Sequence, residues 1–85
     1  MNWELRLKKL VKKEILRFPR RDQEQLRVTL REMSWDPYTG DIVKLHGEKN
    51  GWRRRVGAYR VFYELILEEK VVYVFRIERR TSSIY

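Results

Sequence analysis

Three arginines on neighbouring predicted strands are the residues best suited to chemistry on an anion. Side-chain alternation along residues 52–56 sends Arg53 and Arg55 to one face of a strand, and Arg60 opens the next strand. If helices cover the other face of the sheet, these three guanidinium groups come together on an open surface. Each group can donate two parallel hydrogen bonds to a phosphate, and it keeps its charge at neutral pH. The alternative is that these arginines are only solvated residues of an exposed sheet face, or that they form ion pairs with acidic residues further along the chain: Glu64, Glu68, Glu69 and Glu78.

A second group of candidate residues lies at the end of the sequence. Arg79 and Arg80 follow the last predicted strand, and Tyr85 is the final residue. Because nearby arginines favour an ionised phenol, Tyr85 could exchange a proton, or its ring could stack on a base. The alternative is a tyrosine that packs on the edge of the domain.

Metal and nucleotide chemistry find little support in the sequence. There is no cysteine and one histidine, His46, in a predicted loop, which excludes thiolate catalysis, cysteine-ligated zinc and a paired-histidine nuclease. The carboxylates are scattered, and the four glycines form no phosphate-binding loop. We therefore expect neither a metal site nor a cofactor.

The charge of the chain favours a polyanion or an acidic protein as a partner. The net charge is +8 over 85 residues, with a pI of about 10.1. Eight basic residues and one acidic residue lie between positions 6 and 21, which gives this segment +7 and leaves +1 for the rest. Four lysines of this segment form a candidate phosphate-binding group: Lys8, Lys9, Lys12 and Lys13.

Hydrophobic spacing in the first half of the chain predicts a short strand and two helices. Apolar residues alternate along residues 2–7, and from residue 8 the spacing becomes helical until Pro19. A second helix is expected from about residue 21 or 22, with Asp22 as its cap, and ends before Pro37. The expected buried stripes are Leu7, Val11, Ile15 and Phe18 on the first helix, and Leu26, Leu30 and Met33 on the second.

The second half of the chain is typical of an antiparallel meander. Residues 52–56, 60–67 and 71–79 are rich in β-branched and aromatic residues, and turn residues separate them. The order βααβββ predicts an α+β fold of two layers, in which a helical hairpin packs on one face of an antiparallel sheet. We expect one domain over residues 1–85. No apolar run is long enough for a membrane span and no secretory signal is evident, which suits a cytoplasmic protein.

Two stretches and the end of the chain resemble the RelE/ParE superfamily of toxins from type II toxin-antitoxin modules. The stretches are Lys-Leu-His-Gly at residues 44–47 and Trp-Arg-Arg-Arg-Val-Gly-Ala-Tyr-Arg-Val-Phe-Tyr-Glu at residues 52–64. The end is Arg79-Arg80 followed by Ile84-Tyr85. The resemblance implies the βααβββ fold. For the RelE-like branch it implies a metal-independent, ribosome-dependent endoribonuclease, in which the ribose 2′-hydroxyl of the mRNA attacks the adjacent phosphate.

The resemblance also implies roles for individual residues. Arg60 would stabilise the phosphorane, and Arg79 or Arg80 would bind the phosphate or assist departure of the leaving group. Tyr85 would orient or deprotonate the nucleophile. Arg53 and Arg55 match basic strand residues of the family, and because an arginine is a poor general base they are expected to act as electrostatic stabilisers.

Partners and rival functions follow from the same resemblance. The implied partners are a cognate antitoxin, which binds 1:1, and the ribosome with its mRNA; the lysines of the first helix suit ribosomal RNA or an acidic antitoxin. One rival function is a ParE-like inhibitor that blocks DNA gyrase through protein contacts. Another is a member that binds RNA through its sheet without cleaving it.

Overall fold

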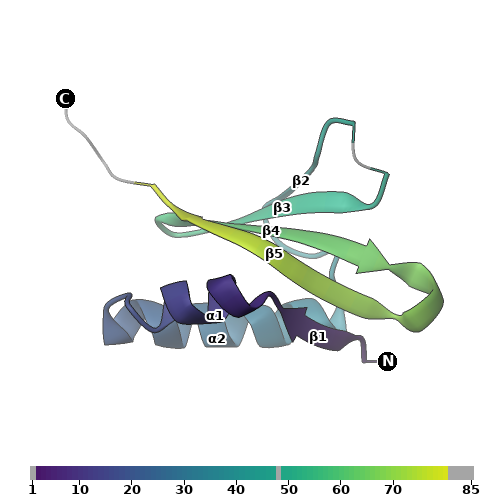
Figure 1. Ribbon diagram of the computed structural model, residues 1–85. Coiled ribbons are helices and arrows are strands. Elements are labelled where there is room, and N and C mark those ends of the chain that lie inside the picture. Colours follow the sequence, from purple (N-terminus) through teal and green to yellow (C-terminus); the bar gives the residue numbers. More distant parts are fainter. Residues whose placement is uncertain (1, 48, 81–85) are drawn as a thin grey trace.

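Within the residues that the structure describes, 2–47 and 49–80 of a computed structural model, five strands form one sheet. Both helices lie on the same face of this sheet, so the fold has two layers (Figure 1). The elements in chain order are β1 (Glu4–Leu7), α1 (Lys9–Ile15), α2 (Arg20–Trp35), β2 (Ile42–Lys44), β3 (Gly51–Val56), β4 (Tyr59–Ile66), the 3-10 helix η1 (Leu67–Glu69) and β5 (Val71–Arg79). The predicted α+β class and the hairpin of helices on one face are confirmed.

The strands lie in the order β1-β5-β4-β3-β2, with β4 at the centre. The predicted antiparallel meander of β3, β4 and β5 is present, but β1 pairs with β5 in parallel, so the sheet is mixed. The segment between α2 and β3 was expected to be a loop. It contains the short strand β2, whose β-branched Ile42 and Val43 pair with β3 at the sheet edge.

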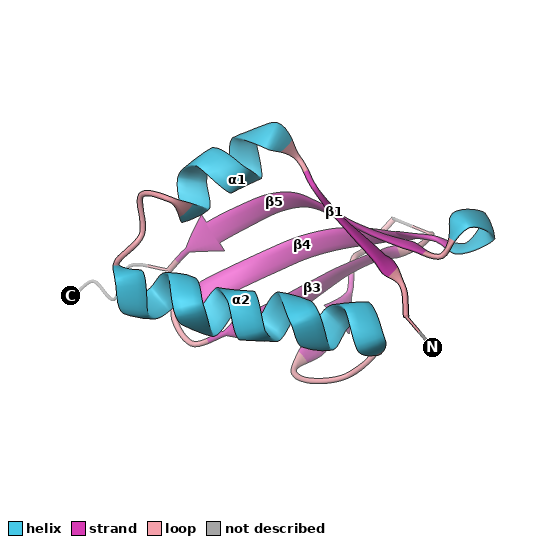
Figure 2. Cartoon of the chain, turned by 90° about the horizontal axis from the view of Figure 1, so that it is seen from below, coloured by secondary structure: helices cyan, strands magenta, loops and turns pink. Residues whose placement is uncertain are grey.

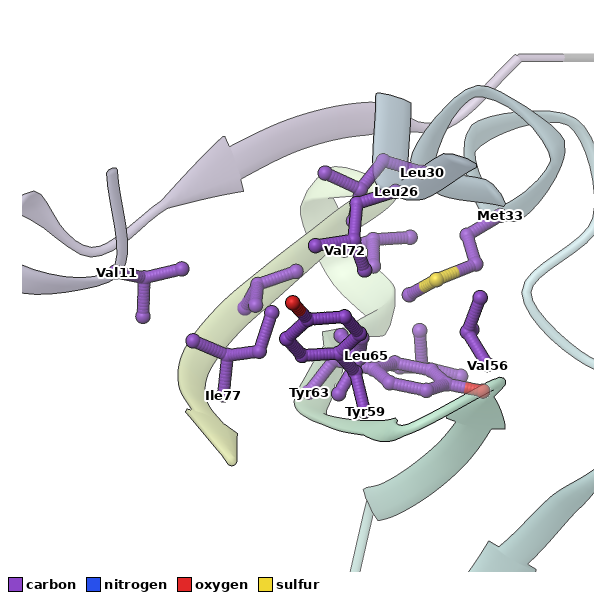
Figure 3. Close-up of a cluster of buried hydrophobic side chains, with 12 residues drawn as sticks. Val11, Leu26, Leu30, Met33, Val56, Tyr59, Tyr63, Leu65, Val72 and Ile77 are labelled. Atoms are coloured by element: carbon purple, nitrogen blue, oxygen red, sulfur yellow. The ribbon is translucent and has the colours of Figure 1, made fainter. Parts of the chain in front are cut away.

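Alternation along β4 separates the core from the other face of the sheet. Every second side chain of β4 points toward the helices and is buried: Tyr59, Val61, Tyr63 and Leu65. Figure 3 shows the cluster that these residues form with Val11 of α1 and with the predicted stripe of α2. That stripe is confirmed, since Leu26, Leu30 and Met33 are all buried.

The start of α2 differs from the expected cap. Pro19 occupies the cap position and no side chain caps the helix, so the prediction for Asp22 is wrong. The carboxylate of Asp22 instead accepts a hydrogen bond from the hydroxyl of Tyr59 at 2.6 Å, and the Tyr59 ring lies 4.6 Å from the ring of Phe18. Asp22 therefore ties the first turn of α2 to the central strand.

A second tyrosine of β4 holds the chain just after α2. Tyr63 is fully buried, and its hydroxyl donates a hydrogen bond of 2.6 Å to the carbonyl oxygen of Pro37. Burial is the main cause that raises the pKa of Tyr63 to about 12.

Neither helix in the described part of the chain is long and apolar enough to span a bilayer.

We predict that Tyr63→Phe lowers the free energy of unfolding by about 1–2 kcal/mol at pH 7, because it leaves a buried carbonyl without its donor. In the unfolded chain Tyr63 ionises near pH 10, whereas in the folded protein it ionises at about 12. The stability that the neutral phenol contributes is therefore complete below pH 10 and lost as the pH rises toward 12.

Urea unfolding at pH 7 and pH 11 checks this prediction. The gap in stability between the wild type and Tyr63→Phe should narrow at the higher pH. Tyr73→Phe is a matched control, since its half-buried hydroxyl has no hydrogen bond within the protein among the described residues, and its effect should stay within about 0.5 kcal/mol. An equal gap at both pH values would contradict the role given to the buried phenol.

Candidate functional site

Among the described residues, no helix covers one face of the sheet, which we call the open face. Both helices lie on the other, which we call the helical face (Figure 1, Figure 2). Arg55 pairs directly with Arg60 across β3 and β4, and Arg53 pairs with Phe62. Cross-strand partners share a face, so the three arginines lie together on the open face, where alternation predicts them. The open face also carries further residues from β4 and β5: Phe62, Glu64, Tyr73, Phe75, Arg76 and Glu78.

Two of the three arginines have acidic neighbours. Arg55 Nε lies 3.0 Å from Oδ2 of Asp41, in the segment before β2, and Arg60 Nη1 lies 3.9 Å from Oε1 of Glu78. Arg53 pairs with no acid among the described residues. Pairing with Glu78 was one of the alternatives that the sequence left open, whereas nothing in the sequence indicated Asp41. The Arg55–Asp41 pair is half exposed and costs little to open, so the Arg55 guanidinium remains available to an anion.

The inner parts of these side chains are held against the sheet. The Nε atoms of Arg53 and Arg60 are buried and find no hydrogen-bond acceptor within the described part of the chain. Burying a donor without a partner costs free energy, and this cost is not particular to the open face, since Nε and Nη1 of Arg54 on the helical face are buried in the same way. Burial of the inner part of each side chain fixes where its guanidinium group emerges from the surface.

Arg54 has a different role, although it lies between two open-face arginines. It points to the helical face, where its side chain is only 11% exposed and Nη2 lies 2.9 Å from Oε1 of Glu32 on α2. A Cβ on Gly40 would come within 2.6 Å of this guanidinium, which explains a glycine at that position, where φ is +85°. Arg54 therefore helps to hold α2 and the following loop on the sheet.

A β-bulge in β5 determines which charged side chains of this strand lie on the open face. The register shifts opposite Phe62: Tyr63 pairs with Val74 and Phe62 with Arg76, so Phe75 is an extra residue in β5. The shift reverses the alternation that follows, because a one-residue change exchanges the two faces. Glu78 consequently lies opposite Arg60 on the open face.

The same bulge places Arg79 on the helical face. Arg79 pairs with the buried Tyr59, and its guanidinium carbon lies 5.8 Å from the centre of the Tyr59 ring. Arg79 is thus separated from the three open-face arginines. Arg80 is exposed, and its backbone N–H donates to the carbonyl of Ala58 at 2.6 Å. Tyr85 lies outside the described residues.

The predicted lysines lie at the β1 edge of the molecule. All four are exposed, and Lys12 and Lys13 lie in the last turn of α1. A shallow hollow of about 560 Å³, the basic hollow, is lined by Leu5, Arg6, Leu7, Lys8, Lys9, Lys12 and Tyr73. Arg6 and Tyr73 are cross-strand neighbours of β1 and β5, so the hollow adjoins the open face. Sequence reasoning missed Arg6 and Tyr73, because their proximity depends on the parallel pairing.

A second depression lies between the two helices. This interhelical groove, of about 370 Å³, has an apolar floor and a polar rim. Its floor consists of Leu7, Ile15, Leu26 and Leu30, and its rim of Arg20, Gln23, Glu24 and Arg27. It lies on the helical side of the molecule, away from the open-face arginines. The sequence predicted the apolar stripe of α2, but it placed Leu7 on the first helix, whereas Leu7 belongs to β1. The space between the helices was not predicted.

A mixed sheet covered on one face by two helices, with arginines gathered on the other, is the arrangement expected of the RelE/ParE toxins that the sequence resembles. Residues 5–84 match the family described as the ParE toxin of the type II toxin-antitoxin system parDE, and the chain belongs to this family. A comparison with curated protein sequences finds no match.

Solved structures of RelE proteins share the fold. The archaeal RelE of the RelE-RelB complex from Pyrococcus horikoshii OT3 superposes with a TM-score of 0.84 at 23% identity, over 98% of this chain and 100% of that one. The isolated E. coli RelE toxin superposes with a TM-score of 0.82 at 25% identity, over 95% of this chain and 87% of that one. A chain of the RelBE2 toxin-antitoxin complex of Mycobacterium tuberculosis superposes with a TM-score of 0.78 at 20% identity, over 94% of this chain and 100% of that one. The protein is therefore a toxin of the type II class.

We predict that Glu78→Gln strengthens binding of a polyanion to the open face. Glu78 lies 3.9 Å from Arg60 and also pairs with Arg76, so removing its charge frees both guanidinium groups. Heparin should bind about fivefold more tightly, since a charge 4 Å away contributes roughly 1 kcal/mol in a water-like dielectric. Glu68→Gln, on η1, is the matched control for net charge. Equal gains for both variants in heparin titrations would show that Glu78 does not restrain these arginines.

Proposed function

We propose that this toxin stops translation by cleaving mRNA on the ribosome, without a metal, and that the open face holds the scissile phosphate. The observation that carries the proposal is the cross-strand grouping of Arg53, Arg55 and Arg60 on a face that no helix covers. Three fixed guanidinium groups on a rigid sheet suit a phosphodiester better than an apolar protein surface.

The chemistry requires little more than this arrangement. The ribose 2′-oxygen attacks the adjacent phosphorus, the bond from phosphorus to the 5′-oxygen breaks, and a cyclic phosphate and a 5′-hydroxyl remain. Negative charge grows on the non-bridging oxygens in the transition state, and preorganised cations lower its energy. Arg60 is the residue to which we assign this stabilisation, with Arg53 and Arg55 beside it. Tyr85, as the phenolate that nearby arginines would favour, would accept the proton of the 2′-hydroxyl, and that proton would pass to the departing 5′-oxygen; as a neutral phenol it would orient the hydroxyl while water carries the proton.

Of the two arginines at the end of β5, Arg79 within the strand and Arg80 just after it, we assign the phosphate contact to Arg80. Arg79 is turned to the helical face, over the ring of Tyr59. If the alternation after the bulge continues, Arg80 returns to the face that carries Arg60 and Glu78. Arg80 would then complete the group of cations, whereas Arg79 would anchor the end of β5.

We predict that Arg60→Ala and Arg80→Ala each reduce mRNA cleavage by about 100-fold or more, whereas Arg79→Ala reduces it by less than about fivefold. Brief expression in bacteria without antitoxin, followed by primer extension of message 5′ ends, measures this. Tyr85→Phe should also lower cleavage. Thermal unfolding of each variant separates a catalytic loss from a folding loss. Equal effects of Arg79→Ala and Arg80→Ala would contradict the assignment.

Gyrase inhibition is the second candidate function, because the matching family is described as ParE toxins. The same cultures distinguish the two functions if plasmid supercoiling is measured beside the message ends. New 5′ ends that follow the reading frame, with translation halted, support the nuclease. Intact messages with altered supercoiling would overturn it and make the arginines a surface for protein binding.

An acidic antitoxin is the partner that we expect on the helical side. Several of the similar structures are RelE–RelB complexes, and the net charge of +8 favours an acidic partner. The interhelical groove has the form that an amphipathic helix fits, with an apolar floor and with Arg20 and Arg27 on its rim. We propose that a helix of the cognate antitoxin binds there, in a 1:1 complex.

We predict that the double variant Arg20→Glu, Arg27→Glu weakens antitoxin binding at least tenfold, because both changes repel an acidic helix. The loss should shrink at high salt, since screening weakens exposed charges. Co-purification with the product of the neighbouring gene, followed by calorimetry, checks this. The double variant Lys44→Glu, Lys49→Glu, at the β2 edge of the sheet, is a control with the same charge change. An unchanged affinity of the double variant would exclude the groove as the docking site.

A further inference from the structure

The bulge in β5 brings two aromatic rings and a guanidinium together on the open face. The centres of the Phe62 and Phe75 rings lie 6.4 Å apart, with 51° between their planes. The guanidinium carbon of Arg76 lies 5.2 Å from the centre of the Phe62 ring. In a regular strand Phe75 and Arg76 would point to opposite faces, so this cluster exists only because of the bulge.

We propose that Phe62, Phe75 and Arg76 form a stacking platform for an unpaired base of a single-stranded RNA. Phe62 shares its face with Arg60, two residues earlier on β4, and pairs with Arg53 across the sheet. The platform thus adjoins the cations to which we assign the scissile phosphate. A nucleotide that places its phosphate on Arg60 places a neighbouring base over the rings. The inference rests on the proposed function, since it names how the same face holds the substrate.

The chemistry of the cluster favours a nucleic-acid base over an apolar peptide. Both rings are partly exposed on a face whose other groups are mainly charged, and Arg76 has 60% of its side chain exposed. Aromatic rings interleaved with cations bind single strands, because each base offers a π-face and each phosphate a charge. Bases in a duplex are already stacked on one another, so the platform selects unpaired RNA.

Tyr73 extends the same path toward the basic hollow. It stands on β5 before the bulge, it pairs with Glu64 of β4 and with Arg6 of β1, and it lines the hollow beside Lys8. A strand of RNA could therefore run from the arginines of β3 and β4, over the rings, to the lysines of α1. The lysines would add affinity without selecting a base.

Binding of a short fluorescent 2′-O-methyl oligoribonucleotide, which cannot be cleaved by attack of its 2′-oxygen, tests the platform. A second oligonucleotide of equal length, whose central sugars carry no base, has the same phosphates but nothing to stack. Phe62→Leu and Phe75→Leu should each weaken binding of the first oligonucleotide about tenfold and leave binding of the second unchanged. Arg53→Ala should weaken both equally and lower the salt dependence.

The matched control is Tyr38→Leu, which removes a half-exposed ring that packs edge-on against Trp52 in the region between α2 and β2. It should change neither affinity, and thermal unfolding of every variant shows whether the fold is kept. The proposal is overturned if the phenylalanine variants bind the first oligonucleotide as the wild type does, or lose affinity for both equally. It is also overturned if the wild type does not distinguish the two oligonucleotides.

Failure of the platform can be told apart from failure of the proposed function. In-frame message cleavage that Arg60→Ala abolishes but Phe62→Leu leaves intact would keep the nuclease and remove the platform. Intact messages with altered supercoiling would remove the nuclease, whatever the oligonucleotides show.

Discussion

Two tyrosine hydroxyls on the central strand fasten both ends of α2 to the sheet. Tyr59 donates to Asp22 in the first turn of the helix, and Tyr63 donates to Pro37 just beyond its last turn, both at 2.6 Å. Because side chains on a strand alternate, orienting these rings toward the helix also orients Arg60 and Phe62 toward the open face. The interaction that holds the two layers together therefore fixes the candidate site on the other side of the sheet.

The bulge in β5 adjusts that site without disturbing the core. Before it, Val72 and Val74 are buried under the helices, and after it Ile77 is buried there again. The extra residue is absorbed on the open face, where Phe75 and Arg76 both meet Phe62. Without the extra residue, Ile77 would lie opposite Arg60, whereas with it Glu78 does. A single inserted position therefore sets both the shape and the charge of the face.

The sequence predicts those features that depend on periodicity. The stripe of α2, the meander and the common face of Arg53, Arg55 and Arg60 all follow from spacings of two or of three and four residues. The stripe predicted for the first helix is wrong in part, because Leu7 belongs to β1 and Phe18 lies beyond the end of α1. Features that depend on pairing between distant segments could not be predicted from the sequence. Neither Phe75 nor Arg76 carries a local signal for a bulge, and β2 is only three residues long. Asp22 has the residue type of a helix cap, but the hydroxyl of Tyr59 competes for its carboxylate.

The interhelical groove and the open-face arginines lie on opposite sides of the sheet, which constrains how an antitoxin could neutralise this toxin. A helix bound in the groove alone would leave Arg60 uncovered. However, Leu7 lines both the groove and the basic hollow, and the hollow leads through Arg6 and Tyr73 to the open face. An acidic segment that leaves the groove past Leu7 would meet the lysines and then the platform. It would compete with RNA for the same cations, so inhibition would need no direct contact with Arg60.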